Sequence, residues 1–213
     1  MDVTKFGHAC VRIQHAGVTL LVDPGVFTGR EALAGADAVL ITHEHPDHVS
    51  VDHLRALDCP VLTIADVAAR LAEEAPDVAE RVRVVSPGER VDAGLAVTAV
   101  GELHAVIHPD LPRLHNCGYL VEAGGERVFH PGDALTGPGV AVDVLCVPVS
   151  APWLKASEAI DFARDVGAPV NLAVHDRVYS EAGLGFLDGH MQRFLPANGQ
   201  RYVRVADGDR LDR

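Results

Sequence analysis

Seven consecutive residues concentrate side chains that could bind a metal ion. The segment Thr42-His43-Glu44-His45-Pro46-Asp47-His48 holds three histidines and two carboxylates. Imidazole nitrogen and carboxylate oxygen are ligands that a borderline cation such as zinc accepts. A solvated turn that merely happens to be rich in histidine would not need so ordered a pattern as His-x-His-x-Asp-His. The sequence therefore predicts a metal site here.

Other metal-compatible residues also follow apolar runs, as this segment follows residues 38–41. His175 comes directly after the run 170–174, and Asp133 comes shortly after the run 127–130. Such runs predict strands, and strand ends in α/β folds are where ligand sites collect. We therefore expect these side chains to converge on one rim.

A further histidine ligand is expected from residues 101–116. This stretch is rich in His and Pro and follows neither helical nor strand periodicity, which is typical of a functional loop. It offers His104, His108 and His115. Spacing alone does not choose among the three.

The elements that must position these residues alternate between strand and helix, which predicts an α/β fold. Ser50, Asp66 and Ser157 are expected to open helices, and the tail after Tyr179 is Gly-rich and is predicted to end in a strand. A hairpin, an Asp-containing turn, a buried strand, a loop and a helix occur twice, which indicates two similar halves within a single domain, residues 1–213. Strands are predicted at residues 11–14, 18–22, 38–41, 61–64, 82–85, 95–100, 119–122, 127–130, 142–147, 170–174 and 202–205.

Composition narrows the classes of function. The chain has 213 residues, 48% hydrophobic and 23% charged, which is ordinary for one globular domain. A net charge of -12 disfavours nucleic acid as a partner. Neither a signal peptide nor a run long enough to span a membrane is visible, so we expect a cytoplasmic protein with reduced cysteines and no membrane partner. The expected partner is a small-molecule substrate, and homo-oligomerisation is left open.

The motifs together resemble the metallo-β-lactamase superfamily of metal-dependent hydrolases. The resemblance rests on His43-x-His45-x-Asp47-His48, a later His104, then Gly132-Asp133 and His175, and it covers nearly the whole chain. It implies a four-layer αβ/βα sandwich of two similar halves. Three further motifs resemble the lactonase-like (L-ascorbate-6-phosphate lactonase-like) branch: Gly7-His8-Ala9, Asp23-Pro24 and His130-x-Gly132-Asp133.

The resemblance also implies a dinuclear centre of two divalent ions, with Zn²⁺ expected and Mn²⁺ or iron as alternatives. His104 is preferred over His108 as the third histidine because it comes soonest after a strand, as in the family. The implied ligands are His43, His45 and His104 for the first metal, and Asp47, His48 and His175 for the second, with Asp133 and a water or hydroxide between them.

Two residues are candidates for proton transfer or substrate contact. Asp47 is placed to orient or deprotonate the attacking water, although metal ligation alone would also explain it. His108 is a candidate acid or substrate contact, and an exposed loop histidine is the alternative.

Five residues are candidates for supporting the ligands or lining the pocket. His8, Asp23 and His130 lie close to the expected ligands, where each could instead be an ordinary core, turn or strand-end residue. Trp153 could wall the pocket and Lys155 could hold an anionic substrate group. The alternative is a surface Trp packed on the next helix and a solvated Lys.

The predicted function is hydrolysis of an ester, lactone or similar bond of a small molecule by a metal-bridging hydroxide. A phosphodiesterase or nuclease of the same superfamily is the alternative. A diiron oxidoreductase is disfavoured because His45 stands where the diiron relatives carry glutamate, and because no flavin-binding domain is present. A non-catalytic metal-binding protein is disfavoured by the complete ligand set.

Overall fold

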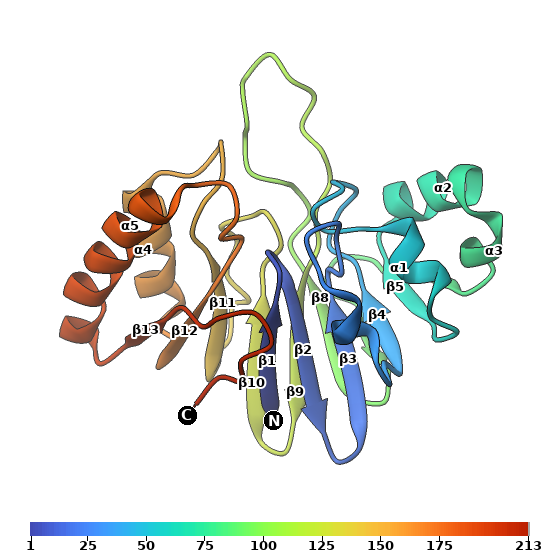
Figure 1. Cartoon of the computed structure of the whole chain (residues 1–213), viewed down its shortest axis with the longest axis horizontal. Coiled ribbons are helices and arrows are strands. Elements are labelled where there is room, and N and C mark those ends of the chain that lie inside the picture. The colour runs from blue at the N-terminus through green and yellow to red at the C-terminus, as the bar shows by residue number, and fades with distance from the viewer. Residues whose placement is uncertain (213) are drawn as a thin grey trace.

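Two β-sheets face each other at the centre of the computed structural model, which describes residues 1–212 (Figure 1). The first sheet has six strands and the second has seven, and in both sheets neighbouring strands follow one another in the sequence. The first contains β1 (Asp2–Phe6), β2 (Cys10–His15), β3 (Val18–Val22), β4 (Ala38–Leu40), β5 (Val61–Thr63) and β6 (Val82–Val84). The second contains β7 (Arg90–Asp92), β8 (Ala96–Val100), β9 (Gly118–Ala123), β10 (Glu126–His130), β11 (Val144–Pro148), β12 (Val170–Val174) and β13 (Arg201–Val203).

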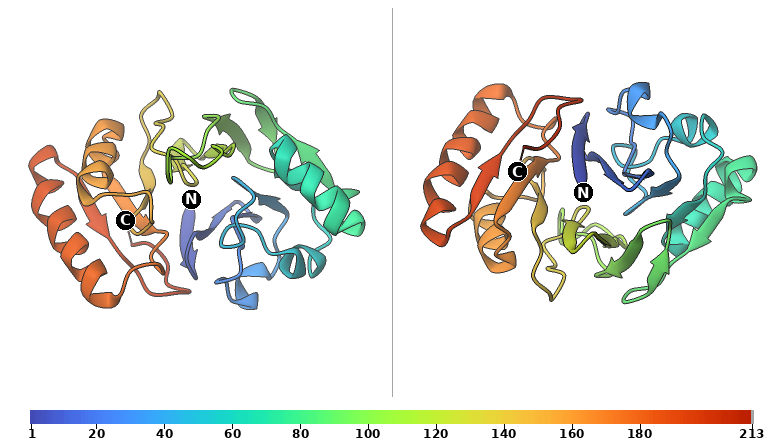
Figure 2. Two further views of the ribbon diagram at one scale, coloured as in Figure 1. Left: turned by 90° about the horizontal axis from the view of Figure 1, so that it is seen from above. Right: turned by 90° about the horizontal axis from the view of Figure 1, so that it is seen from below.

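Helices cover the outer side of each sheet (Figure 2). Those beside the first sheet are α1 (Val51–Arg55), α2 (Ala65–Glu74) and α3 (Pro76–Ala79), and those beside the second are α4 (Ala156–Val166) and α5 (Glu181–Phe194). Two short 3-10 helices, Arg30–Leu33 and Pro196–Asn198, complete the described elements. The predicted four-layer αβ/βα sandwich is therefore confirmed.

The two sheets share one plan. Strands β1 to β3 are antiparallel and β3 to β6 are parallel, while β7 to β10 are antiparallel and β10 to β13 are parallel. Hairpins join the antiparallel strands, whereas the parallel strands need longer connections that bring helices onto the outer face. The weak sequence echo corresponds to this repeated arrangement.

Alternation along β11 shows how the layers are held together. Val144 and Cys146 belong to the apolar cluster between the sheets, whereas Leu145 and Val147 belong to the cluster under α4 and α5. Successive side chains of a strand point to opposite faces, so a continuous apolar run is required of a strand buried on both sides.

Several predicted elements differ from the structure. The tail after Tyr179, where only a terminal strand was predicted, also contains α5 (Glu181–Phe194), which packs through Leu184, Leu187 and Met191. Ser157 does not cap α4; Lys155 does, and Glu158 accepts a hydrogen bond from the Lys155 backbone at 2.9 Å. Strands β1 and β7 were not predicted, being short and largely polar in sequence.

Two predicted helix starts lie near the first sheet, and only the first of them is capped by the predicted residue. Ser50 caps α1, its hydroxyl accepting from the backbone N–H of His53, as predicted. Asp66 lies in the first turn of α2, but the cap residue is Ile64 and no side chain caps it. Within residues 1–212, every helix is too short or too polar to cross a lipid bilayer.

Candidate metal centre

Four segments from both sheets meet at one rim to form a cluster of histidines and carboxylates. His43 to His48 follow β4, His104 follows β8, Asp133 follows β10 and His175 follows β12. These are the carboxyl ends of strands, where side chains from neighbouring elements can face a common point. The structure thus brings together all seven residues that the resemblance implies as ligands.

Asp133 lies between two groups of imidazoles. Its Oδ1 is 3.1 Å from His48 Nε2, and its Oδ2 is 3.2 Å from His175 Nε2 and 3.3 Å from His104 Nε2. The residue is 2% exposed, so its charge faces these rings rather than water. One carboxylate therefore touches both groups.

The first group consists of His43, His45, His104 and Asp133, whose ligand atoms all lie within 4.8 Å of one another. His43 Nε2 is 3.0 Å from His45 Nδ1. Burial lowers the pKa of both of these histidines, which keeps the rings neutral and their lone pairs available.

The second group joins His48 and His175 to Asp133, with Asp47 beside them. Asp47 Oδ2 lies 3.3 Å from His175 Nε2 and 3.9 Å from His48 Nε2. Burial opposes protonation of His175, but Asp133 and Asp47 outweigh it and raise the pKa of His175 to about 9. The facing carboxylates, Asp133 above all, likewise raise the pKa of His48 against its burial.

The unpaired atoms of the cluster test whether a cation fits. Within residues 1–212, the buried atoms that face the centre without a hydrogen-bond partner include His8 Nε2. Four more belong to the implied ligands: His48 Nε2, His104 Nε2, His175 Nε2 and Asp133 Oδ1. Buried polar atoms are rarely left unpaired, because doing so costs about 1–3 kcal/mol each. Divalent cations held by these atoms would satisfy all four, so the residues fit a metal centre.

Asp23 fixes the orientation of the rings nearest to it. Its Oδ1 accepts from the Thr42 backbone N–H at 2.8 Å, and its Oδ2 accepts from the Thr42 hydroxyl and from His48 Nδ1, both at 2.7 Å. The Thr42 hydroxyl donates its only hydrogen to Asp23, so it can only accept from His43 Nδ1, 3.0 Å away. Both histidines therefore carry their proton on Nδ1, which leaves Nε2 free for a cation.

Backbone carbonyls do the same for two other histidines. His104 Nδ1 donates to the Ala105 carbonyl at 2.6 Å, and His175 Nδ1 donates to the Ser150 carbonyl. His175 has φ 58° and Asp23 has φ 48°, a left-handed region that non-glycine residues rarely adopt. Strained backbone at two positions of the cluster indicates that the surrounding structure holds them for function.

His8 meets the cluster differently. Its Nδ1 accepts from the Arg177 backbone N–H at 2.9 Å, so the proton of the neutral ring is on Nε2. That nitrogen faces Asp47 Oδ2 at 3.3 Å. His8 also groups geometrically with Asp47 and His175. Its proton, however, occupies the nitrogen that faces Asp47, so the neutral ring has no lone pair there for a cation.

Comparison with known proteins places this geometry in a family. A family model described as the Beta-lactamase superfamily domain matches residues 2–175. The chain belongs to the metallo-β-lactamase superfamily. The predicted family and enzyme class, a metal-dependent hydrolase of this superfamily, are thereby confirmed.

Similar proteins align with most of this chain. Protein Rv0786c of Mycobacterium tuberculosis is 40% identical, covering 94% of this chain and 95% of its own. A UPF0173 metal-dependent hydrolase of Xanthobacter autotrophicus is 34% identical over 62% of each chain. The crystal structure of a metal-dependent hydrolase, described as putative, from Parabacteroides distasonis has a TM-score of 0.77 at 21% identity, covering 95% of this chain and 91% of that one. At that identity it shows the fold alone.

The turn after β10, which carries Asp133, is tightly packed. Gly132 has φ 63°, and a Cβ there would lie 2.3 Å from Asn116 Oδ1. That amide oxygen accepts from the Asp133 backbone N–H at 3.0 Å. His130 donates from Nε2 to the Ala9 carbonyl at 2.8 Å and accepts from the Gly132 N–H, so it steadies the same turn.

Trp153 contacts the centre directly. Its indole Nε1 donates to Asp133 Oδ2 at 3.1 Å, and its ring lies against those of His104 and His175. Lys155 instead points to the surface, 79% exposed, where its ammonium lies 3.3 Å from Glu158. Of the two residues proposed from the sequence to line the pocket, Trp153 therefore contacts the centre and Lys155 does not.

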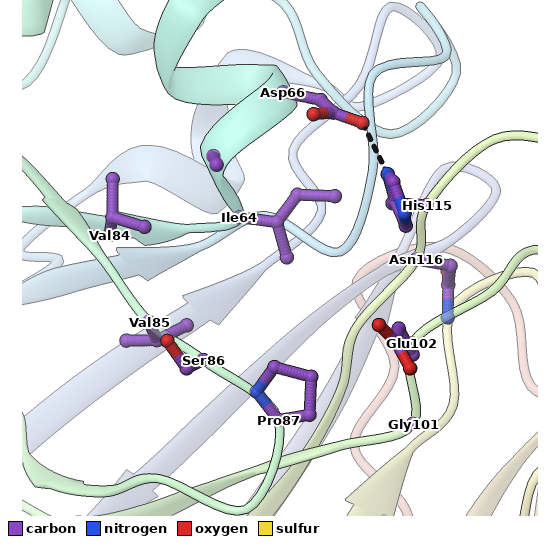
Figure 3. Close-up of a pocket in the computed structure, with 11 residues that line it drawn as sticks. Ile64, Asp66, Val84, Val85, Ser86, Pro87, Gly101, Glu102, His115 and Asn116 are labelled. Atoms are coloured by element: carbon purple, nitrogen blue, oxygen red, sulfur yellow. Dashed lines mark hydrogen bonds and ion pairs between the residues drawn. The ribbon is translucent and has the colours of Figure 1, made fainter.

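The other loop histidines lie away from the centre. His108 belongs to the 101–116 loop, and its side chain is 62% exposed and 3.8 Å from Asp110. His115 pairs with Asp66 at 2.7 Å, at the edge of a cavity of about 200 Å³ (Figure 3). Apolar residues Ile64 and Val85 line that cavity, which contains none of the seven cluster residues.

Sequence reasoning missed several residues that support the cluster, namely Thr42, Asn116, Ser150 and Arg113. Thr42 stands immediately before the His-rich motif, which was a usable signal. The others act through backbone contacts far apart in sequence, such as the bond from Arg113 Nε to the His104 carbonyl at 2.8 Å.

Proposed function

We propose that this chain is a dinuclear hydrolase that cleaves an ester, lactone or similar bond of a small molecule. The observation that carries the proposal is Asp133, whose carboxylate lies within 3.3 Å of imidazoles from both groups. A carboxylate between two groups of imidazoles can contact one cation in each group, which favours two bound ions over one. Imidazole and carboxylate ligands favour Zn²⁺, with Mn²⁺ or iron as alternatives.

Two bound divalent ions would supply a hydroxide nucleophile at neutral pH and polarise the carbonyl group whose carbon is attacked. The chain's own residues fix where this happens. Hydrogen bonds to Asp23, Thr42 and two backbone carbonyls hold the rings before any cation arrives. Such preorganisation avoids rearrangement during the reaction.

Asp47 is the residue suited to orienting the attacking water. Its side chain is 24% exposed, whereas those of His48, His104 and Asp133 are 3% exposed or less. It therefore combines contact with the centre and access to solvent. His8 Nε2 lies 3.3 Å from Asp47 Oδ2, on the buried side of this carboxylate. In hydrolysis, water adds to the acyl carbon, and its proton leaves on the departing alcohol.

The preference for an ester or lactone rests on the resemblance of Gly7-His8-Ala9 and Asp23-Pro24 to the lactonase-like branch. The net charge of -12 supports a small molecule in the cytoplasm over a nucleic acid. A phosphodiesterase of the same superfamily uses the same kind of centre, so the substrate screen must include both bonds.

Metal content tests the centre. Elemental analysis of protein loaded with Zn²⁺ or Mn²⁺ should give about two ions per chain, and His104→Ala should lose one. Replacing the exposed His108 with alanine should leave metal content unchanged. One ion per chain in the unmodified protein, or two in His104→Ala, would contradict the proposed ligands.

The reaction is tested with loaded protein on two kinds of substrate. A panel of lactones and aryl esters should be hydrolysed. Asp47→Asn should reduce turnover, with metal content measured alongside because Asp47 is also an implied ligand of the second metal. Faster cleavage of bis-p-nitrophenyl phosphate would move the assignment to a phosphodiesterase. Iron with a redox signal would indicate an oxidoreductase, and silence on every substrate a non-catalytic protein.

A further inference from the structure

A cleft opens directly beside the candidate metal centre. It has a volume of about 300 Å³ and lies between the 101–116 loop and the loops that follow β10 and β11. Ala105, next to His104, and Ala134, next to Asp133, both line it, as does Trp153, which donates to Asp133. A substrate with its scissile bond at Asp133 would extend into this cleft.

Part of the cleft wall is apolar. Val106, Leu135 and Trp153 contribute aliphatic and aromatic surface, and Val106 is 51% exposed in the absence of anything covering it. Apolar surface of this kind stabilises a hydrocarbon part of a ligand by about 25 cal/mol per Å² removed from water.

Arg113 is the cation of the cleft. Its Nε donates to the His104 carbonyl at 2.8 Å, while among residues 1–212 neither of its Nη atoms has a hydrogen-bond or carboxylate partner. The residue lies at the base of the loop, where Leu103 bridges to His115 and His104 N–H donates to the Leu114 carbonyl. The guanidinium is therefore held in place beside a ligand of the centre, with two donor groups free.

The other charged groups of this region are already paired. Glu158 also lines the cleft, but it accepts from the backbone and the ammonium of Lys155. Arg177 pairs with Asp207 and so does not offer a second free cation. In a chain of net charge -12, Arg113 therefore offers an exposed guanidinium to a ligand in the cleft.

We propose that Arg113 binds an oxyanion, carboxylate or phosphate, carried by the substrate on an apolar stem that lies along Val106, Leu135 and Trp153. A guanidinium presents parallel N–H groups that match carboxylate and phosphate oxygens. The proposal rests on the proposed function, because it defines the substrate of the same centre. It transfers to Arg113 the anion-binding role that the sequence suggested for Lys155.

Kinetics on a matched pair of esters tests the proposal. For p-nitrophenyl hydrogen glutarate, Arg113→Gln should lower kcat/KM about 10–100-fold, mainly through KM, since a charge-assisted bond is lost. For p-nitrophenyl pentanoate, which is similar in length but uncharged, the loss should be clearly smaller, because only the bond from Arg113 Nε to the His104 carbonyl is lost. Arg113→Lys should restore part of the preference, and Arg55→Gln, an exposed arginine on α1, should alter neither ester.

Three outcomes would overturn the proposal. An equal loss on both esters means that Arg113 acts only by holding His104. Equal activity of Arg113→Gln and the parent protein on both esters means that the cleft takes no oxyanion. Loss of the preference in Lys155→Gln, with Arg113→Gln unaffected, would assign the anion to Lys155.

Equilibrium binding separates this proposal from the proposed function. Calorimetry with glutarate and with propyl phosphate should show which oxyanion binds more tightly, and Arg113→Gln should weaken that ligand about 10–100-fold. This result needs no turnover. Normal hydrolysis of the uncharged ester without any effect of Arg113→Gln on binding refutes the oxyanion site alone, whereas an inactive, metal-free protein refutes the proposed function.

Discussion

At the scale of single residues, the candidate centre depends on which nitrogen of each imidazole carries its proton. Asp23 and the Ser150 carbonyl accept from Nδ1 of His48 and His175, which turns each Nε2 toward Asp133. His8 has the opposite arrangement because Arg177 N–H donates to its Nδ1. Ligand and donor are thus distinguished by hydrogen bonds and not by residue type.

Residue types and order were enough to identify the cluster, but not its supports. The motif His43 to His48 shows its ligands openly, and Asp133 and His175 follow visible strands. Asn116 is an ordinary polar residue in a loop until the structure shows its amide on the Asp133 turn. Such contacts depend on backbone positions from distant segments, which no local pattern reports.

Asp23→Asn tests the support of His48. The amide keeps the shape of the side chain but loses the negative charge that Nδ1 donates to, so metal affinity should fall about 10–100-fold. Competition with a chelating dye measures the affinity. Asp92→Asn, at an exposed turn where the carboxylate accepts from Gly94, is the matched control and should bind metal normally. Unchanged affinity in Asp23→Asn would show that His48 needs no such partner.

Trp153 should report metal binding through its fluorescence. It is the one tryptophan of the chain, and its indole donates to Asp133 Oδ2 at 3.1 Å. A cation on Asp133 changes the field at the indole, so the emission of the metal-free protein should shift or change in intensity on titration with Zn²⁺. The change should saturate at the stoichiometry found by elemental analysis. Emission that ignores the metal would place Trp153 away from Asp133 in solution.

At the scale of elements, α5 shows where sequence reasoning fails. No helix was predicted in this Gly-rich segment, which contains Gly183, Gly185 and Gly189, and glycine costs about 1 kcal/mol in a helix interior. The helix forms because Leu184, Leu187 and Met191 share one buried face, at spacings of three and four residues. Tertiary packing therefore overrides a poor intrinsic propensity, whereas longer apolar strands such as β11 and β12 were visible from composition alone.

Glycines of α5 and of the metal-site turn should respond oppositely to alanine. A Cβ at Gly185 or Gly189 meets nothing within 4 Å, so each substitution should stabilise the protein by about 0.5–1 kcal/mol. At Gly132, with φ 63° and Asn116 Oδ1 at 2.3 Å from the added Cβ, alanine should destabilise it by more than about 1 kcal/mol. Urea denaturation measures all three. Destabilisation by both helix substitutions would contradict the open surface of α5.

At the scale of the whole molecule, the two sheets present their loops at one rim, while the chain ends are joined at β1. Leu211 N–H donates to the Val3 carbonyl, and Lys5 N–H donates to the Asp209 carbonyl, so the C-terminal segment runs along the first strand (Figure 1). A buried ion pair reinforces this junction. Lys5 Nζ, 2% exposed, lies 2.6 Å from Asp176, the neighbour of His175.

Breaking this pair should be costly, because Asp176 is buried and, among residues 1–212, no cation other than Lys5 forms an ion pair with it. Burial raises the pKa of Asp176 against the opposing charge of Lys5. Lys5→Met leaves the carboxylate without its partner and should lower the free energy of unfolding by about 3–5 kcal/mol. Lys5→Met combined with Asp176→Leu removes both charges and should recover most of the loss. Arg83→Met, which breaks an exposed pair with Glu89, should leave the denaturation midpoint nearly unchanged. If the double variant is no more stable than Lys5→Met, the cost lies in lost packing of the lysine stem and not in the stranded charge of Asp176.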